Sequence, residues 1–330
     1  MPPPSGISYA MMVPSEPNGG HIDDAPDQHA GDRPGEGQLF GALLLLSAIW
    51  GYNFVVTKEV LAYVDPFDFT GARTFLGALA LFAFAALTGR RLPIPPWGPM
   101  VVLGVLQTAA FGTLIQWALV SDEAGRTVIV VYSMPLLVAL AAVFLNERIG
   151  PGALAAVVVA AVGLGLILQP RSDSSPAWNG AALAMLAGLI WAIAAVAVRM
   201  TPRREGDSLL ALTAWQMLFG ALLLGVVVLA LPTKPLTPAP QFWAALAYSS
   251  ILATGVAWFL WLYILERMSA GAAGLSTLLV PVVGLAAGWL QLGERPDGIT
   301  ALGMALILAA LASLSLFNLR KGRAPEEGKR

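Results

Sequence analysis

Ten long apolar runs alternate with short polar breaks along most of the chain. The runs cover residues 39–57, 66–88, 98–120, 126–145, 151–169, 178–198, 208–231, 241–265, 272–292 and 298–318. Each run has about the 17–25 residues that a helix needs to cross the hydrocarbon core of a bilayer. The breaks combine Gly, Pro and charged residues, as in 89–93 and 201–204. The pattern therefore predicts an all-α membrane protein with ten transmembrane helices.

Composition points to the same class and excludes several others. The chain has 330 residues, of which 57% are hydrophobic and 12% are charged, whereas soluble domains carry about 25% charged residues. There is no Cys, and both His residues, His21 and His29, precede the first apolar run. The apolar part therefore offers no thiol and no His ligand, and we expect no catalytic residue, no metal and no cofactor. A net charge of −1 provides no basic field, so we expect no nucleic-acid partner.

Two polar tails flank the apolar part. Residues 1–38 are rich in Pro and Gly and contain six acidic residues but only one base, Arg33. Such a segment cannot bury enough apolar surface to offset its ordering entropy, so we expect a disordered N-terminal tail. Residues 319–330 are basic and form the predicted C-terminal tail.

The distribution of positive charge predicts the orientation in the membrane. With a cytoplasmic N-terminus, 13 of the 19 Lys and Arg residues lie in cytoplasmic segments, five lie outside, and Arg73 lies within a span. Lys and Arg accumulate on the cytoplasmic side of membrane proteins. We therefore predict that both tails are cytoplasmic.

The two halves of the apolar part repeat one another. The matched pairs are Trp50 and Trp191, Gly51 and Ala192, Gly77 and Gly220, Pro135 and Pro281, and Glu147 and Glu294. Each repeat, 39–170 and 176–318, contains five predicted spans, which is an odd number. The second repeat must then enter the membrane from the opposite side, so the sequence predicts two inverted five-helix repeats, an arrangement typical of secondary transporters.

These duplicated motifs resemble a known family. They are Trp50-Gly51, Trp191-Ala192, and the stretches that end at Glu147-Arg148 and Glu294-Arg295. In this order, over residues 39–318, they are similar to two units of the EamA branch of the drug/metabolite transporter superfamily. The resemblance implies a ten-helix exporter of the bacterial inner membrane that moves metabolites, often amino acids. The second repeat departs from the first at Gln216, which stands where the first repeat has Arg73.

Aromatic and polar residues within the runs are the candidates for a substrate cavity. Trp50, Asn53, Phe54 and Thr57 share one helix face because they are spaced i, i+3, i+4 and i+7. The other candidates are Gln116, Trp117, Tyr132, Ser133, Trp191, Trp258 and Trp261. The alternative for these residues is packing or contact with lipid. The first and sixth runs should line the cavity through Trp50 and Trp191, and the resemblance implies the third, fourth, eighth and ninth runs as well.

A second group of residues suggests gating or structural roles. Its members are Arg73, Pro135, Glu147, Pro281 and Glu294. Arg73 lies about 12 Å below the outer end of its helix, where it either reaches the outer interface beside an acidic residue such as Glu294 or faces the substrate pathway. We expect the two prolines to bend their helices, and the two glutamates to lie near the N-terminus of the helix that follows each.

Two functions compete for this pattern. A membrane-embedded lipid or prenyl transferase would place acidic or His clusters at the membrane surface, and the chain offers one acidic pair, Asp65 and Asp68. That pair reads as a helix start with Pro66 in the first turn. We therefore expect a transporter that is not an enzyme, works as a monomer in the lipid bilayer, and exports small neutral or zwitterionic metabolites such as amino acids. Arg73 is off-centre in its span and no acidic residue falls in the middle of any span, so neither a multiply charged anion nor a multiply charged cation would have an opposite charge near the middle of the membrane.

Overall fold

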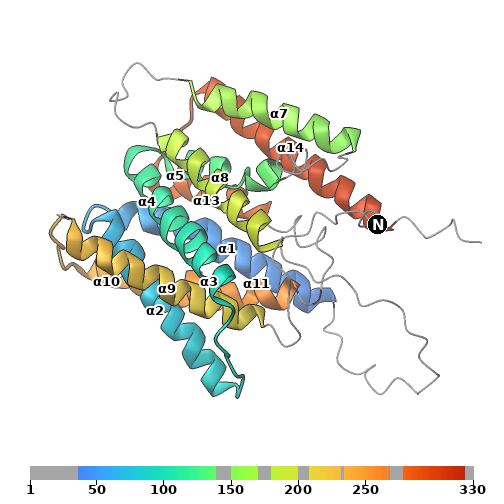
Figure 1. Ribbon diagram of the computed structural model, residues 1–330. Helices are drawn as coiled ribbons and strands as arrows, with labels where there is room; N and C mark the ends of the chain where they lie inside the picture. The colour runs from blue at the N-terminus through green and yellow to red at the C-terminus, as the bar shows by residue number, and fades with distance from the viewer. Residues whose placement is uncertain are drawn as a thin grey trace, which may run out of the picture.

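The structure is a computed structural model that describes residues 36–138, 150–169, 180–199, 208–231, 234–265, 267 and 278–323. The regular elements of these segments are all helices, and the segments contain no β-strand. Each of the ten apolar runs contributes at least one helix (Figure 1). Among the residues singled out above, Glu147 and most of the N-terminal tail lie outside the described residues.

The structure describes seven helical elements in the first half of the chain. They are α1 (Glu36–Val60), α2 (Pro66–Leu87), α3 (Trp97–Leu103), η1 (Gly104–Ala110), α4 (Phe111–Ser121), α5 (Ala124–Val131) and α7 (Pro151–Ile167). In the second half it describes α8 (Gly180–Arg199), α9 (Leu209–Ala230), α10 (Pro240–Ala247), η2 (Tyr248–Val256), α11 (Ala257–Leu265), α13 (Leu279–Leu292) and α14 (Gly298–Arg323). Because α1 begins at Glu36 and α14 continues to Arg323, the helices extend into both regions expected to be tails.

The helices begin and end where local chemistry favours it. Asp65 caps α2 by accepting a hydrogen bond from the Phe67 N–H at 2.9 Å, and Pro66 occupies the first helical position. The helix start expected at this acidic pair is therefore confirmed. At the far end of α13, Gly293 adopts φ 67°, a left-handed conformation that Gly reaches without steric cost.

Within the described residues, six helices are long and apolar enough to cross a membrane. They are Gly37–Val60, Pro66–Leu87, Trp97–Ser121, Gly180–Ala197, Leu209–Ala230 and Pro240–Ile264. Four shorter apolar helices, Ala124–Val138, Pro151–Ile167, Leu279–Leu292 and Gly298–Leu314, accompany them. The chain is therefore a multi-pass helical membrane protein. The count of ten spans and the inverted arrangement remain predictions.

One long helix in each half contains a π-helical segment. The helix Trp97–Ser121 contains η1, and the helix Pro240–Ile264 contains η2. A π-helical segment widens the turn and alters which side chains face inward, and such segments are frequent at functional sites. These two helices correspond to the third and eighth predicted spans.

Matched glycines make reciprocal contacts between the halves. A Cβ atom at Gly77 of α2 would lie 2.5 Å from the Cβ of Thr254 in η2, and one at Gly220 of α9 would lie 2.6 Å from the Cβ of Thr108 in η1. Each glycine thus lets its helix pack closely on the π-helical segment of the other half. Neither position has room for a larger side chain.

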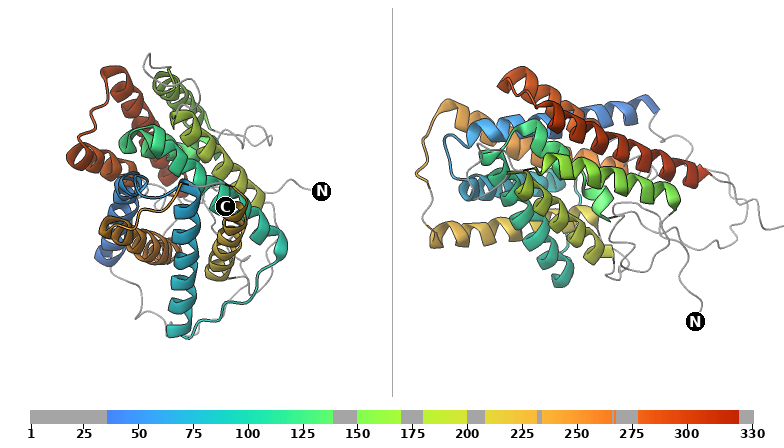
Figure 2. Two further views of the ribbon diagram at one scale, coloured as in Figure 1. Left: turned by 90° about the vertical axis from the view of Figure 1, so that its left-hand side faces the viewer. Right: turned by 90° about the horizontal axis from the view of Figure 1, so that it is seen from above.

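The helices α7 and α14 form a second close pair along one side of the molecule (Figures 1 and 2). A Cβ atom at Gly163 or Gly303 would lie 2.7 Å from the carbonyl oxygen of the other glycine. Their contacts extend the largest buried apolar cluster, which includes Ala160, Ile167 and Ile307. This pair supports the bundle from one side.

The prolines act differently from one another. Pro135 follows a break in the helix, because α5 ends at Val131 and the chain turns at Tyr132 and Ser133 before it becomes helical again. Pro281 instead lies in the first turn of α13, where the missing N–H leaves no intrahelical bond unmade. The bend expected within the helix at Pro281 is therefore wrong, and at Pro135 the helix is interrupted.

Candidate functional site

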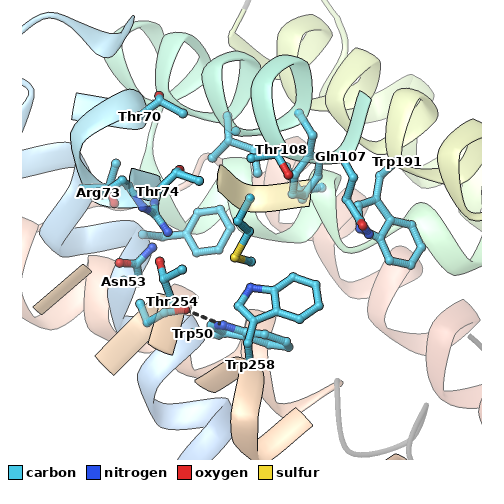
Figure 3. Close-up of a pocket in the computed structure, with 18 of the residues that line it drawn as sticks. Trp50, Asn53, Thr70, Arg73, Thr74, Gln107, Thr108, Trp191, Thr254 and Trp258 are labelled. Carbon is cyan, nitrogen blue, oxygen red and sulfur yellow. Dashed lines mark hydrogen bonds between the residues drawn. The ribbon is translucent and has the colours of Figure 1, made fainter. Parts of the chain in front are cut away.

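A cavity of about 190 Å³ lies among helices from both halves. A single water molecule needs roughly 15 Å³ by this measure, so the cavity has room for a small organic molecule. It is lined by residues of α1, α2, η1, α4, α5, α8, α9, η2 and α11, together with Tyr132 and Met134 beyond α5 (Figure 3). The wall is mostly apolar with a few polar groups, as is usual for small-molecule sites.

The structure brings together seven of the ten cavity candidates. These are Trp50, Asn53, Thr57, Tyr132, Trp191, Trp258 and Trp261, and Phe54 lines the cavity with them. They come from three different helices, α1, α8 and α11, and the turn after α5. The helix face of α1 that the spacing of Trp50, Asn53 and Thr57 indicated is the face that α1 presents to the cavity.

Three candidates lie outside the cavity wall. Gln116 is buried in α4, where its Nε2 donates a hydrogen bond to the Thr70 hydroxyl. Ser133 is fully buried and donates to the Val130 carbonyl at 2.7 Å. Trp117 is 37% exposed and packs edge-on against Phe67. Gln116 supports a cavity residue, whereas Trp117 faces outward because α4 turns its other face to the bundle.

Aromatic rings form the apolar floor of the cavity. The ring centroids of Trp50 and Trp258 lie 5.9 Å apart with the planes at 72°, and those of Trp50 and Trp261 lie 6.0 Å apart. The indole N–H of Trp50 donates to the Ala253 carbonyl in η2 at 3.0 Å (Figure 3). This bond fixes the Trp50 ring, so the cluster offers a large apolar surface at little cost in side-chain entropy.

Polar side chains gather at the opposite side, where Arg73 lies with Thr74 and Asn53 (Figure 3). Of the two positions expected for Arg73, the structure shows the one in the cavity wall. No ion pair joins it to an acidic residue in the part of the chain that the structure describes. Thr70, Arg73 and Thr74 share one face of α2 by their i, i+3 and i+4 spacing.

The cavity includes two helices that the sequence did not indicate. Thr70, Arg73 and Thr74 come from α2, while Gln216 and Met217 come from α9. No described residue of α13 lines it, although the ninth run was expected to. Polar residues in the middle of apolar runs were the available signal, because Gln107, Thr108, Gln216 and Thr254 all have this character.

Two buried polar atoms of the wall have no hydrogen-bond partner among the described residues. They are the Thr57 hydroxyl and the Gln216 side-chain oxygen. Thr57 is 1% and Gln216 2% exposed. Buried polar groups are almost always satisfied, so these atoms are available to a solute or to water in the cavity. Among the residues that the structure describes, no three His, Cys, Asp or Glu side chains lie together as a metal site would require.

A separate polar cluster ties the N-terminus of α5 to its neighbours. The Glu294 carboxylate, just after α13, accepts hydrogen bonds from the Ala124 and Gly125 N–H groups. Arg126 pairs with Asp122 at 3.2 Å and also donates to the Ile167 carbonyl. We expected Glu294 to lie near the start of the following helix, α14. That position belongs to Asp297, which accepts from the Thr300 N–H at 2.8 Å, and Glu294 reaches across to α5.

Relatives with assigned functions resemble the chain over most of its length. A probable amino-acid metabolite efflux pump of Salmonella typhimurium is 27% identical over 298 residues, which cover 85% of this chain and 95% of that protein. A probable terminal-alkyne amino-acid exporter of Streptantibioticus cattleyicolor is 27% identical over 297 residues, covering 88% of this chain and 97% of that protein. A solved crystal structure superposes with a TM-score of 0.62 at 22% identity, covering 87% of this chain and 99% of that chain. It supports the fold alone.

The family assignment rests on both halves of the chain. The EamA-like transporter family matches residues 39–169 and residues 178–316, which together make up most of the sequence. The names of the relatives point to a transporter and not to an enzyme. The cavity lies between the two matched halves, and the chain belongs to the EamA-like transporter family.

Proposed function

We propose that the protein exports small neutral or zwitterionic metabolites, among them amino acids with apolar or aromatic side chains. The observation that carries this proposal is the two-sided cavity, with Trp50, Trp258 and Trp261 on one side and a few hydrogen-bonding groups on the other. Such a wall gives an apolar body a surface to pack on and gives a polar end its partners. The names of two relatives, an efflux pump and an exporter for amino-acid compounds, support the same substrate class.

Alternating access is the mechanism that we propose for transport. The cavity draws its wall from both halves, and matched glycines of α2 and α9 pack on the π-helical segments of the opposite half. Two halves that contact each other in this reciprocal way are suited to rocking about a shared site. We further propose that the protein works as a monomer in a bacterial cell membrane, with both termini in the cytoplasm.

Transport by the purified protein tests the proposal. Proteoliposomes loaded with unlabelled phenylalanine should accumulate labelled phenylalanine or leucine faster than protein-free liposomes. They should take up spermidine and glucose 6-phosphate, each preloaded in turn, at a small fraction of that rate. Strict preference for one of the multiply charged solutes would overturn the substrate class, because the described cavity wall contains no cluster of like charges.

A further inference from the structure

Arg73 is the one charged residue among the described residues that line the cavity. It lies in α2, within a segment long and apolar enough to span the membrane. None of the hydrogen bonds or ion pairs found in the described part of the chain satisfies its guanidinium. A charged side chain at membrane depth is expensive, and such residues usually mark a substrate pathway. Because Arg remains protonated, the cavity carries one positive charge.

The groups around Arg73 extend this positive site with hydrogen-bond donors. Ser249 of η2 donates to the Asn53 side-chain oxygen at 3.0 Å, which orients the Asn53 amide. The amide NH₂ group then has no acceptor among the described residues. Thr74, one position beyond Arg73, adds a hydroxyl on the same side of the cavity (Figure 3). A planar guanidinium beside an amide NH₂ matches the two oxygens of a carboxylate.

The pairing of the two halves explains why this charge is single. Gln216 of α9 stands where the second half corresponds to Arg73, and it too lines the cavity. Its side-chain oxygen is a buried acceptor with no partner in the described chain. The site therefore has a cation on the α2 side and a neutral acceptor on the α9 side. No described lining residue is acidic, so nothing in the wall compensates Arg73.

We propose that Arg73 binds the carboxylate of the substrate, and that a carboxylate on an apolar or aromatic body is what the cavity selects. A bound carboxylate neutralises the cavity, whereas an amine without a carboxylate adds a second positive charge. The ammonium group of an amino acid would then interact with the ring faces of the Trp cluster and donate a hydrogen bond to the Gln216 side-chain oxygen. This inference rests on the proposed function and adds that solutes without a carboxylate are rejected.

Three related solutes separate the parts of this proposal. Phenylalanine has both a carboxylate and an ammonium, 3-phenylpropionate has only the carboxylate, and 2-phenylethylamine has only the ammonium. Binding to the full-length protein in detergent can be measured by calorimetry, and transport by exchange in proteoliposomes. We expect phenylalanine and 3-phenylpropionate to bind and 2-phenylethylamine to bind at least about tenfold more weakly.

Variants at Arg73 then test the assigned residue. Arg73→Gln copies Gln216 and should weaken binding of 3-phenylpropionate by about 10- to 100-fold, with no loss for 2-phenylethylamine. Arg73→Lys retains the positive charge but not the planar, forked guanidinium. Its affinity for 3-phenylpropionate should therefore fall between those of the wild type and Arg73→Gln. Arg90→Gln removes an exposed Arg beyond the end of the same helix and should bind all three solutes like the wild type. Size-exclusion profiles show whether each variant is folded.

The outcomes distinguish this site from the proposed function. If Arg73→Gln and Arg73→Lys both bind 3-phenylpropionate as the wild type does, Arg73 is not the carboxylate site. If the wild-type protein transports 2-phenylethylamine at the same rate as phenylalanine, it is a transporter without the proposed selectivity. If carboxylates bind in an Arg73-dependent way but no solute crosses the membrane, the site is supported and the exporter function fails.

Discussion

The carboxylate of Glu294 accepts a hydrogen bond from the Ala124 N–H at 2.6 Å, although 170 residues separate the two positions. Its other oxygen accepts from the Gly125 N–H at 2.9 Å. One acidic side chain after α13 thus occupies the positive end of α5, where N–H groups have no intrahelical acceptor. The C-terminal part of α5 contributes Val131 to the cavity, so this contact helps to position one side of the site.

Replacing this carboxylate should destabilise the protein. Glu294→Ala removes both hydrogen bonds and leaves two N–H groups partly buried, and we expect a loss of about 1–2 kcal/mol in the free energy of unfolding. Glu294→Gln keeps one acceptor and should lose less. Thermal unfolding in detergent, followed by circular dichroism, measures the effect. The neighbouring Arg295 is exposed, so Arg295→Gln serves as the control; equal midpoints for Glu294→Ala and this control would contradict the role.

Close packing of α9 on η1 leads to a second prediction. A Cβ atom at Gly220 would lie 2.6 Å from the Gly104 carbonyl oxygen, which is backbone and cannot move aside. Gly220→Ala should therefore destabilise the protein by about 1–3 kcal/mol. Nothing lies within 4 Å of a Cβ at Gly225 of the same helix, so Gly225→Ala should be neutral or slightly stabilising. The same unfolding assay compares the two variants. Similar midpoints would show that α9 and η1 can move apart without loss of stability.

Hydropathy alone predicted which parts of the chain are helical. Apolar runs of sufficient length admit few structures in a bilayer, because every backbone N–H and C=O must be satisfied within the segment. The helix face formed by Trp50, Asn53 and Thr57 was also predictable, since their i, i+3 and i+7 spacing places them together on a helix whatever packs against it. The start of α2 at Asp65 and Pro66 was predictable too, because a helix start depends only on neighbouring residues.

Contacts between distant elements were not predictable in this way. Sequence spacing does not show that α2 turns Arg73 toward the cavity, because that depends on which elements of the other half pack around α2. The partner of Glu294 lies across the bundle and not in the next helix, since Asp297 already caps α14. Trp117 had the composition of a cavity residue but faces away from the cavity, because one turn of α4 carries both buried and exposed positions.

The predicted orientation can be tested with single cysteines, since the chain has none of its own. Thr88 follows α2, and Ser121 ends the helix Trp97–Ser121 that comes next, so the two exposed residues should lie on opposite sides of the membrane. With the N-terminus inside, a cysteine at Ser121 should react with an impermeant maleimide in intact cells. One at Thr88 should react only after permeabilisation.

Two further positions extend the test to the second half. Ser172 and Thr201 are not among the described residues. The predicted spans place Ser172 on the external side of the membrane and Thr201 on the cytoplasmic side. A cysteine-free wild-type background provides the blank. Labelling of Ser121 and Thr88 from the same side would contradict the span count and the inverted repeat together, whereas a full reversal would contradict only the orientation.

The aromatic side of the cavity gives the last prediction. Trp50 contacts Trp258 and Trp261 and is fixed by its bond to the Ala253 carbonyl, while Trp191 comes from α8 on the far side (Figure 3). Trp50→Ala and Trp191→Ala each remove a large ring from the wall. We expect each variant to bind the substrate roughly tenfold more weakly, because a lost aromatic contact costs about 1.5 kcal/mol. Trp117→Ala removes a ring of the same size outside the cavity and should transport normally. Exchange of labelled phenylalanine in proteoliposomes, at matched protein content, measures all three. Normal exchange by both cavity variants would mean that these rings only pack, and equal loss in all three would mean that Trp replacement harms the fold and not the site.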